Sequence, residues 1–123
     1  GVVDKAGQPY ILHPIRLMLK MNLDEEKATA LLHDVIEDSN ITADDLLAEG
    51  IPETVITAVL ALTRQEGETY KAFVLRAKQN PIARKVKIAD IEDNLNVLRI
   101  KQLTEKDLSR IAKYHKAWQS LQD

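Results

Sequence analysis

The chain is organised around one stretch, LLHDVIED at residues 31–38. It places a histidine beside an aspartate and adds a second acidic pair one helical turn later. On an α-helix, which turns by about 100° per residue, the histidine and the three acids share an arc of roughly 140°. The apolar residues of the stretch take the other side. The pattern predicts a helix that packs one face into a core and presents on the other His33, Asp34, Glu37 and Asp38.

Two interpretations of this polar face are open. Acids this close raise one another's pKa and repel, which costs stability unless a cation or a proton sits among them. An arbitrary acidic pair is usually a solvated helix face. The adjacent histidine and aspartate favour a divalent metal instead, because imidazole nitrogen and carboxylate oxygen are suitable ligands.

Composition limits the classes of protein to consider. With 123 residues, 45% hydrophobic and 29% charged, the chain makes one globular domain. A net charge of −2 gives no electrostatic case for nucleic acid or an anionic membrane as partner. The absence of cysteine excludes disulfides and thiolate metal sites and fits a cytoplasmic location. Apolar runs are too short to span a bilayer, and no signal-peptide pattern is present.

Hydrophobic periodicity and capping residues predict an all-α single domain of about seven helices. No stretch alternates strictly enough in hydropathy to indicate a strand. The predicted helices start at His13-Pro14, run over 24–38 with Asp24 as the cap, begin at Thr42 and end at Gly50, cover 53–62, start at Thr69 and stop at Asn80-Pro81, cover 81–98, and start at Thr104.

A second set of polar residues lies on the predicted helix 81–98. Asp90 and Asn94 are four residues apart and share a face, and Lys87 precedes Asp90 by one turn. Apolar neighbours on that side predict that Asp90 faces protein, where a carboxylate must be paired or must bind metal. A salt bridge between Lys87 and Asp90 is the alternative.

The remaining candidates are weaker. His13 precedes the proline that opens a helix and is interpreted mainly as fixing that junction, with a metal role as the minor alternative. No glycine-rich phosphate loop occurs. An anionic substrate would therefore rely on helix N-termini and on cations, with Lys5, Arg16 and Lys87 as candidates.

Three segments together resemble a known family. DKAGQPYILHP at 4–14, LLHDVIED at 31–38 and VKIAD at 86–90, followed by Asn94, are similar to the HD-domain hydrolases of the RelA/SpoT type. The likeness covers nearly the whole chain in the right order. It is greatest to the small stand-alone alarmone hydrolases, because nothing corresponds to a synthetase domain.

The resemblance implies metal-dependent hydrolysis of the 3′-pyrophosphate of ppGpp or pppGpp. In that family two histidines and two aspartates hold a divalent cation, usually manganese, which activates water. Carried over by motif, the roles are metal ligation by His33, Asp34 and Asp90, positioning of water and proton transfer by Glu37 and Asp38, and substrate contact by Lys5 and Asn94, to which Lys87 is added for phosphate.

The resemblance also places the first metal histidine just upstream of Gly1. Residues 1–123 are therefore expected to be an HD phosphohydrolase domain without its N-terminal helix. Two alternatives stay open: an HD phosphohydrolase acting on another nucleotide, and a degenerate nucleotide-binding or protein-interaction domain without turnover. The oligomeric state is not predicted.

Overall fold

The computed structural model describes residues 12–96, 98 and 100–122, and this part of the chain contains eight helices and no strand. The all-α prediction is confirmed. The helices are α1 (Leu12–Leu19), α2 (Asp24–Leu32), α3 (Val35–Asp38), α4 (Ala43–Ala48), α5 (Glu53–Ala61), α6 (Tyr70–Lys78), α7 (Pro81–Asn94) and α8 (Glu105–Leu121). Each of these described helices is too short or too polar to span a bilayer.

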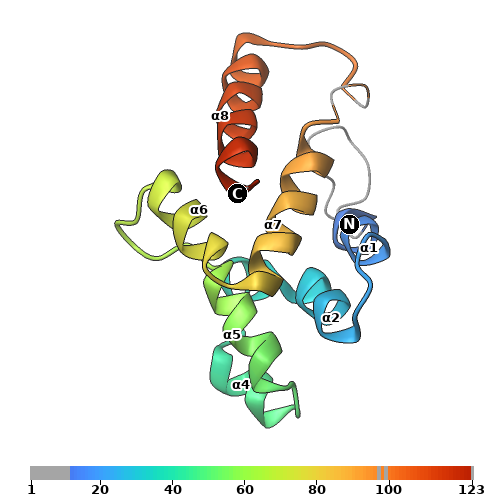
Figure 1. The fold of residues 1–123 in the computed structure, drawn as a ribbon, viewed down its shortest axis with the longest axis vertical. Helices are drawn as coiled ribbons and strands as arrows, with labels where there is room; N and C mark the ends of the chain where they lie inside the picture. Colours follow the sequence, from blue (N-terminus) through green and yellow to red (C-terminus); the bar gives the residue numbers. More distant parts are fainter. Residues whose placement is uncertain (1–11, 97, 99, 123) are drawn as a thin grey trace.

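Helix α7 is the centre of the bundle. It contacts α1, α2, α5, α6 and α8, and Figure 1 shows it between the α1–α2 pair and α6. The side chain of Asn80 caps it by accepting from the amides of Ile82 and Ala83, and Pro81 occupies its first turn. It ends at Asn94, four residues before the predicted end at Leu98.

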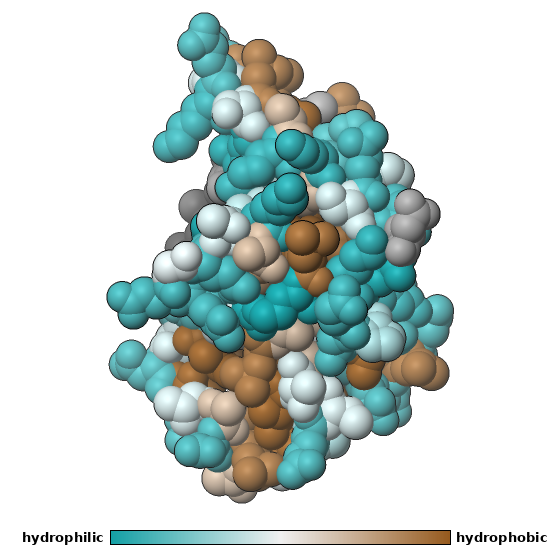
Figure 2. Space-filling view, turned by 60° about the vertical axis from the view of Figure 1, so that its left-hand side comes forward, coloured by the Kyte–Doolittle hydropathy of each residue, from teal (hydrophilic) through white to brown (hydrophobic). Residues whose placement is uncertain are grey.

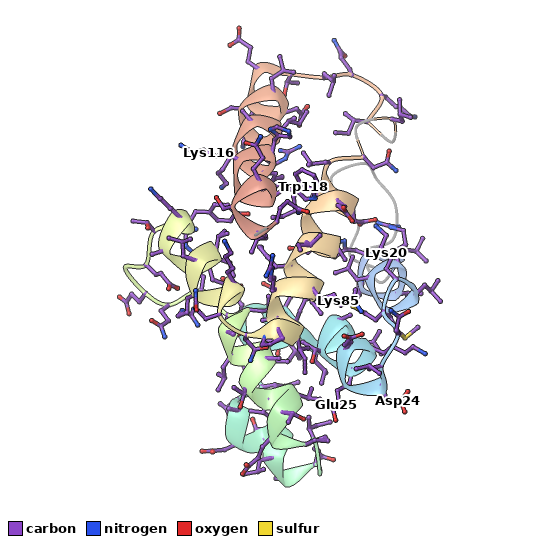
Figure 3. The ribbon with its side chains drawn as sticks, in the orientation of Figure 1. Lys20, Asp24, Glu25, Lys85, Lys116 and Trp118 are labelled. Atoms are coloured by element: carbon purple, nitrogen blue, oxygen red, sulfur yellow. The ribbon has the colours of Figure 1, made fainter. Side chains whose placement is uncertain are left out.

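Two hydrophobic clusters hold the other helices against α7. The cluster toward α1 and α2 contains Leu17, Met21, Ala30, Leu62, Ala77, Ala83, Val86 and Ala89. The cluster toward α8 contains Val74, Ile91, Ala117 and Leu121. Figure 3 shows Trp118 on the α7 side of α8 and Lys116 on the opposite side, and the indole nitrogen of Trp118 donates to Glu92 of α7 at 3.2 Å.

Helix starts follow the predicted capping residues at α4 and α8 but not at α2. Thr42 and Thr104 each accept from the amide three residues later. The predicted cap of α2, Asp24, is instead its first helical residue. Glu26 caps the helix by accepting from the backbone amide of Leu23 at 3.1 Å, and it also accepts from Lys85 of α7 at 3.0 Å.

The helix predicted over 24–38 is broken at the histidine. The Nδ1 of His33 lies 2.7 Å from the carbonyl oxygen of Ala30, which the amide of Asp34 would bond in a continuous helix. Asp34 leaves the helical region, with φ −107° and ψ 1°, and α3 begins after it. The predicted division of faces is also only partly right, because Leu31 is 44% exposed whereas Ala30 is fully buried.

The face in Figure 2 is mostly hydrophilic, with hydrophobic residues gathered in its lower half, at the height of α4 and α5 in Figure 1. Leu47 and Leu60 on these helices are among the exposed large hydrophobic side chains of the described residues. The polar motif residues lie elsewhere, at the junction of α1, α2 and α7.

Candidate metal centre

Three helices bring two histidines and an aspartate together. His13 from α1, His33 at the end of α2 and Asp90 from α7 each offer one ligand atom, and these atoms all lie within 4.8 Å of one another. The residues are 6%, 4% and 9% exposed, and the two imidazole centroids are 5.4 Å apart. A buried group of this kind could hold a divalent metal ion.

Asp90 is the residue around which the cluster forms. Its Oδ1 lies 2.8 Å from Nε2 of His13 and 3.6 Å from Nε2 of His33. Its Oδ2 accepts from the ammonium of Lys87 at 3.1 Å, and the side-chain Nδ2 of Asn94 donates to Oδ1 at 3.2 Å. Burial raises the pKa of Asp90, but the charge of Lys87 and the bonds to the histidines outweigh it and hold this pKa well below its usual range.

A hydrogen bond to the backbone carbonyl of Ala30 fixes the orientation of the His33 ring. Because a carbonyl oxygen can only accept, the Nδ1 facing Ala30 carries a proton, and Nε2 points to the carboxylates. This Nε2 lies 3.1 Å from Asp34 and 3.6 Å from Asp90. Burial lowers the pKa of His33, but contacts with Asp34 and Asp90 raise it to about 10.

The same Nε2 supports the fit to a metal ion. It is buried, and among the described residues it has no partner in good hydrogen-bonding geometry, although two carboxylates are near. A buried polar atom without a partner has a cost that a bound ion would remove. Nitrogen and carboxylate ligands with the imidazole held by its other nitrogen are typical of protein metal sites.

The acidic residues that follow lie beside this cluster. A pocket of about 250 Å³ is lined by Pro14, Leu31, His33, Asp34, Val35, Asp38 and Ser39. Burial and the charge of Asp34 raise the pKa values of both Glu37 and Asp38. Asp38 opens on the same pocket as His33 and Asp34. Glu37 does not line it.

Comparison with known proteins gives a consistent picture. No family model matches the chain. It is 31% identical, over 89% of its length, to a guanosine-3′,5′-bis(diphosphate) 3′-pyrophosphohydrolase of Aquifex aeolicus, and 31% identical over 80% to that of Vibrio cholerae. The chain is related to the RelA/SpoT-type (p)ppGpp hydrolases. It spans about a sixth of these relatives, 17% and 16% of their lengths.

The chain is also similar in structure to a protein of another source. The match is to the solved structure of a metazoan ortholog of SpoT, described as hydrolysing ppGpp. It covers 97% of this chain and 75% of the metazoan chain, with a TM-score of 0.75. Sequence identity in this match is 23%, so it establishes the helical HD-domain fold.

His13 is a candidate ligand to which sequence analysis gave a metal role only as the minor alternative. It was interpreted mainly as fixing a helix junction, with the first metal histidine expected upstream of Gly1. The structure puts His13 in contact with Asp90, so α1 contributes a histidine to the group. Residue spacing gave no signal for this contact, because it depends on which helix α1 packs against. Arg16, one turn later on α1, reaches Asp93 of α7 as His13 does.

The other predicted residues are placed as follows. His33 and Asp90 lie in one group, and Asp34 contacts His33 but is not in the mutual 4.8 Å group. Lys87 and Asn94 both bond Asp90, and Lys87 is 8% exposed. Lys5 lies outside the described residues.

Proposed function

We propose that this chain is a metal-dependent phosphohydrolase that removes the 3′-pyrophosphate of ppGpp or pppGpp. The observation that carries the proposal is the buried cluster of His13, His33 and Asp90, in which Nε2 of His33 makes no hydrogen bond of good geometry among the described residues. The similarity of the chain to proteins named as 3′-pyrophosphohydrolases supports the choice of substrate. A nucleotide as small-molecule partner and a cytoplasmic location are parts of the same proposal.

The proposed ligands of the ion, Mn²⁺ or another divalent metal, are His13, His33 and Asp90, with Asp34 as a fourth. Asp34 is the natural addition because its Oδ2 already lies 3.1 Å from Nε2 of His33 and its side chain is 32% exposed. When bound, such an ion makes water more acidic and neutralises phosphate charge.

Proton transfer is proposed for the acidic pair on α3. In the hydrolysis, water adds to the phosphorus attached at the ribose 3′-oxygen, and the bond between this phosphorus and the 3′-oxygen breaks. The products are pyrophosphate and GDP, or GTP when the substrate is pppGpp. One proton leaves the water and one reaches the ribose oxygen. Asp38 lines the pocket beside His33, and Glu37 stands one turn beyond Asp34. Their raised pKa values make both carboxylates better proton acceptors than an ordinary exposed acid.

Substrate contacts are proposed for three residues. Asn94 and Lys87 flank Asp90 on α7, so a nucleotide phosphate near the ion would lie close to both. Lys5 is proposed from the sequence motif alone. The two lysines would supply local positive charge for an anionic substrate in a chain whose net charge is −2.

The test compares metal content with turnover on the same samples. We expect Glu37→Gln and Asp38→Asn to retain Mn²⁺ and the fold but to hydrolyse ppGpp about 10²–10⁴-fold more slowly in single-turnover assays. Glu25→Gln, an exposed acid on α2 (Figure 3), is the matched control and should keep the wild-type rate. Wild-type rates for both α3 variants would remove the acidic pair from the mechanism.

The same assay separates the alternatives. Hydrolysis of a different nucleotide, with ppGpp untouched, would identify a phosphohydrolase of another specificity. Nucleotide binding with metal but without release of pyrophosphate would indicate a binding domain. Absence of any bound divalent ion would contradict the proposal as a whole.

A further inference from the structure

Asp93 is buried beside the candidate metal centre without belonging to it. It is 6% exposed, and its Oδ2 lies 2.6 Å from Nδ1 of His13. Arg16 donates from Nε to Oδ1 at 2.7 Å and from Nη2 to Oδ2 at 2.9 Å. A forked pair of this kind fixes the plane of the carboxylate as well as its charge.

The consequence falls on His13. A carboxylate already accepting two bonds from a guanidinium is an acceptor toward Nδ1 as well, so Nδ1 of His13 donates and Nε2 faces Asp90 at 2.8 Å. His33 is held in the same way, except that its Nδ1 donates to the backbone carbonyl of Ala30. The two histidines thus present the same nitrogen to Asp90, one held by the main chain and one by a side chain.

We infer that Asp93, clamped by Arg16, is a positioning residue that holds His13 with Nε2 aimed at the metal centre. This inference rests on the metal centre in the proposed function. It adds that metal affinity depends on a carboxylate that touches neither ion nor substrate. Partners of ligand histidines typically contribute 10–100-fold to metal affinity.

The experiment measures Mn²⁺ binding to the purified chain by isothermal titration calorimetry, without substrate. Asp93→Asn should weaken binding by about 10–100-fold. Glu92→Gln, which removes the exposed acid next to it on α7, should stay within about twofold of wild type. Thermal unfolding of the metal-free proteins shows which variants are folded.

A double-mutant cycle distinguishes positioning from general support of the fold. In a His13→Gln background, Asp93→Asn should change Mn²⁺ affinity by less than about twofold, because the group that it positions is gone. If Asp93→Asn does not fold, Arg16→Gln replaces it, leaving the carboxylate in place but unclamped. We expect Arg16→Gln to weaken Mn²⁺ binding too, but by a smaller factor than Asp93→Asn.

Each result decides the matter. Near-wild-type Mn²⁺ affinity of Asp93→Asn, or of Arg16→Gln where that variant replaces it, overturns the inference and leaves the metal centre standing. An equal loss with and without His13 also overturns it, since Asp93 would then act elsewhere. If wild type binds no Mn²⁺, both the inference and the proposed function fail.

Discussion

Replacing Asp90 with asparagine should destabilise the metal-free protein strongly, because it isolates a buried charge. Lys87 is 8% exposed, and its ammonium bonds Oδ2 of Asp90 at 3.1 Å. Removing one partner of a buried ion pair costs about 3–5 kcal/mol. With an unfolding entropy of about 2.1 cal/mol/K per residue, this corresponds over 123 residues to a fall in melting temperature of about 12–20 °C.

The assay is thermal unfolding followed by circular dichroism in the presence of EDTA. If Lys87 causes the loss, the double variant Asp90→Asn with Lys87→Met should recover most of it, because the methionine places no charge beside Phe73 and Tyr70. Adding Lys116→Met, an exposed lysine of α8, should recover nothing. A loss below about 1 kcal/mol, or a double variant as unstable as Asp90→Asn, would refute this reasoning.

Two further predictions concern stability away from the centre. Arg76 donates to both carboxylate oxygens of Glu68, at 2.8 and 2.9 Å, and holds the pKa of Glu68 at about 2, below its ordinary 4.5. The stability from this lowered pKa is therefore present above about pH 4.5 and is lost as pH falls toward 2. Urea midpoints over this range should fall less steeply in Arg76→Met, and an unchanged slope would contradict the assignment. Leu17→Ala should cost about 2–5 kcal/mol in urea unfolding because Leu17 is fully buried, whereas Leu19→Ala, at a side chain 73% exposed, should cost about 0.5 kcal/mol or less.

Features set by neighbours in sequence were predictable. Thr104 and Asp107 cap α8 because the bond joins residues three apart, a spacing that is visible in the chain itself. The burial of Asp90 followed from apolar residues at helical spacing around it. Its pairing with Lys87, one turn earlier, was likewise among the alternatives that the sequence offered.

The contribution of α1 was not predictable in the same way. Seventy-seven positions separate His13 from Asp90, and nothing near His13 in sequence states which helix α1 packs on. His13 becomes a candidate ligand only because α1 packs against α7 in the folded protein.

The break at His33 was also hidden from periodicity. Helical spacing describes side chains on an unbroken backbone, whereas here the His33 side chain contacts the carbonyl of Ala30 where the helix breaks. The single helix predicted over 24–38 therefore assigned some side chains to the wrong face. Leu31, expected in the core, is 44% exposed.

The long separation of His13 from Asp90 in sequence links metal binding to the stability of the fold. An ion bound by both residues would act as a reversible cross-link between α1 and α7. The unfolded chain, in which the two residues are far apart, would bind the ion weakly. Binding to the native state alone adds about 2.7 kcal/mol when free ion exceeds its dissociation constant about 100-fold. Starving the cell of metal would then shorten the survival of the protein against proteases as well as slow its chemistry.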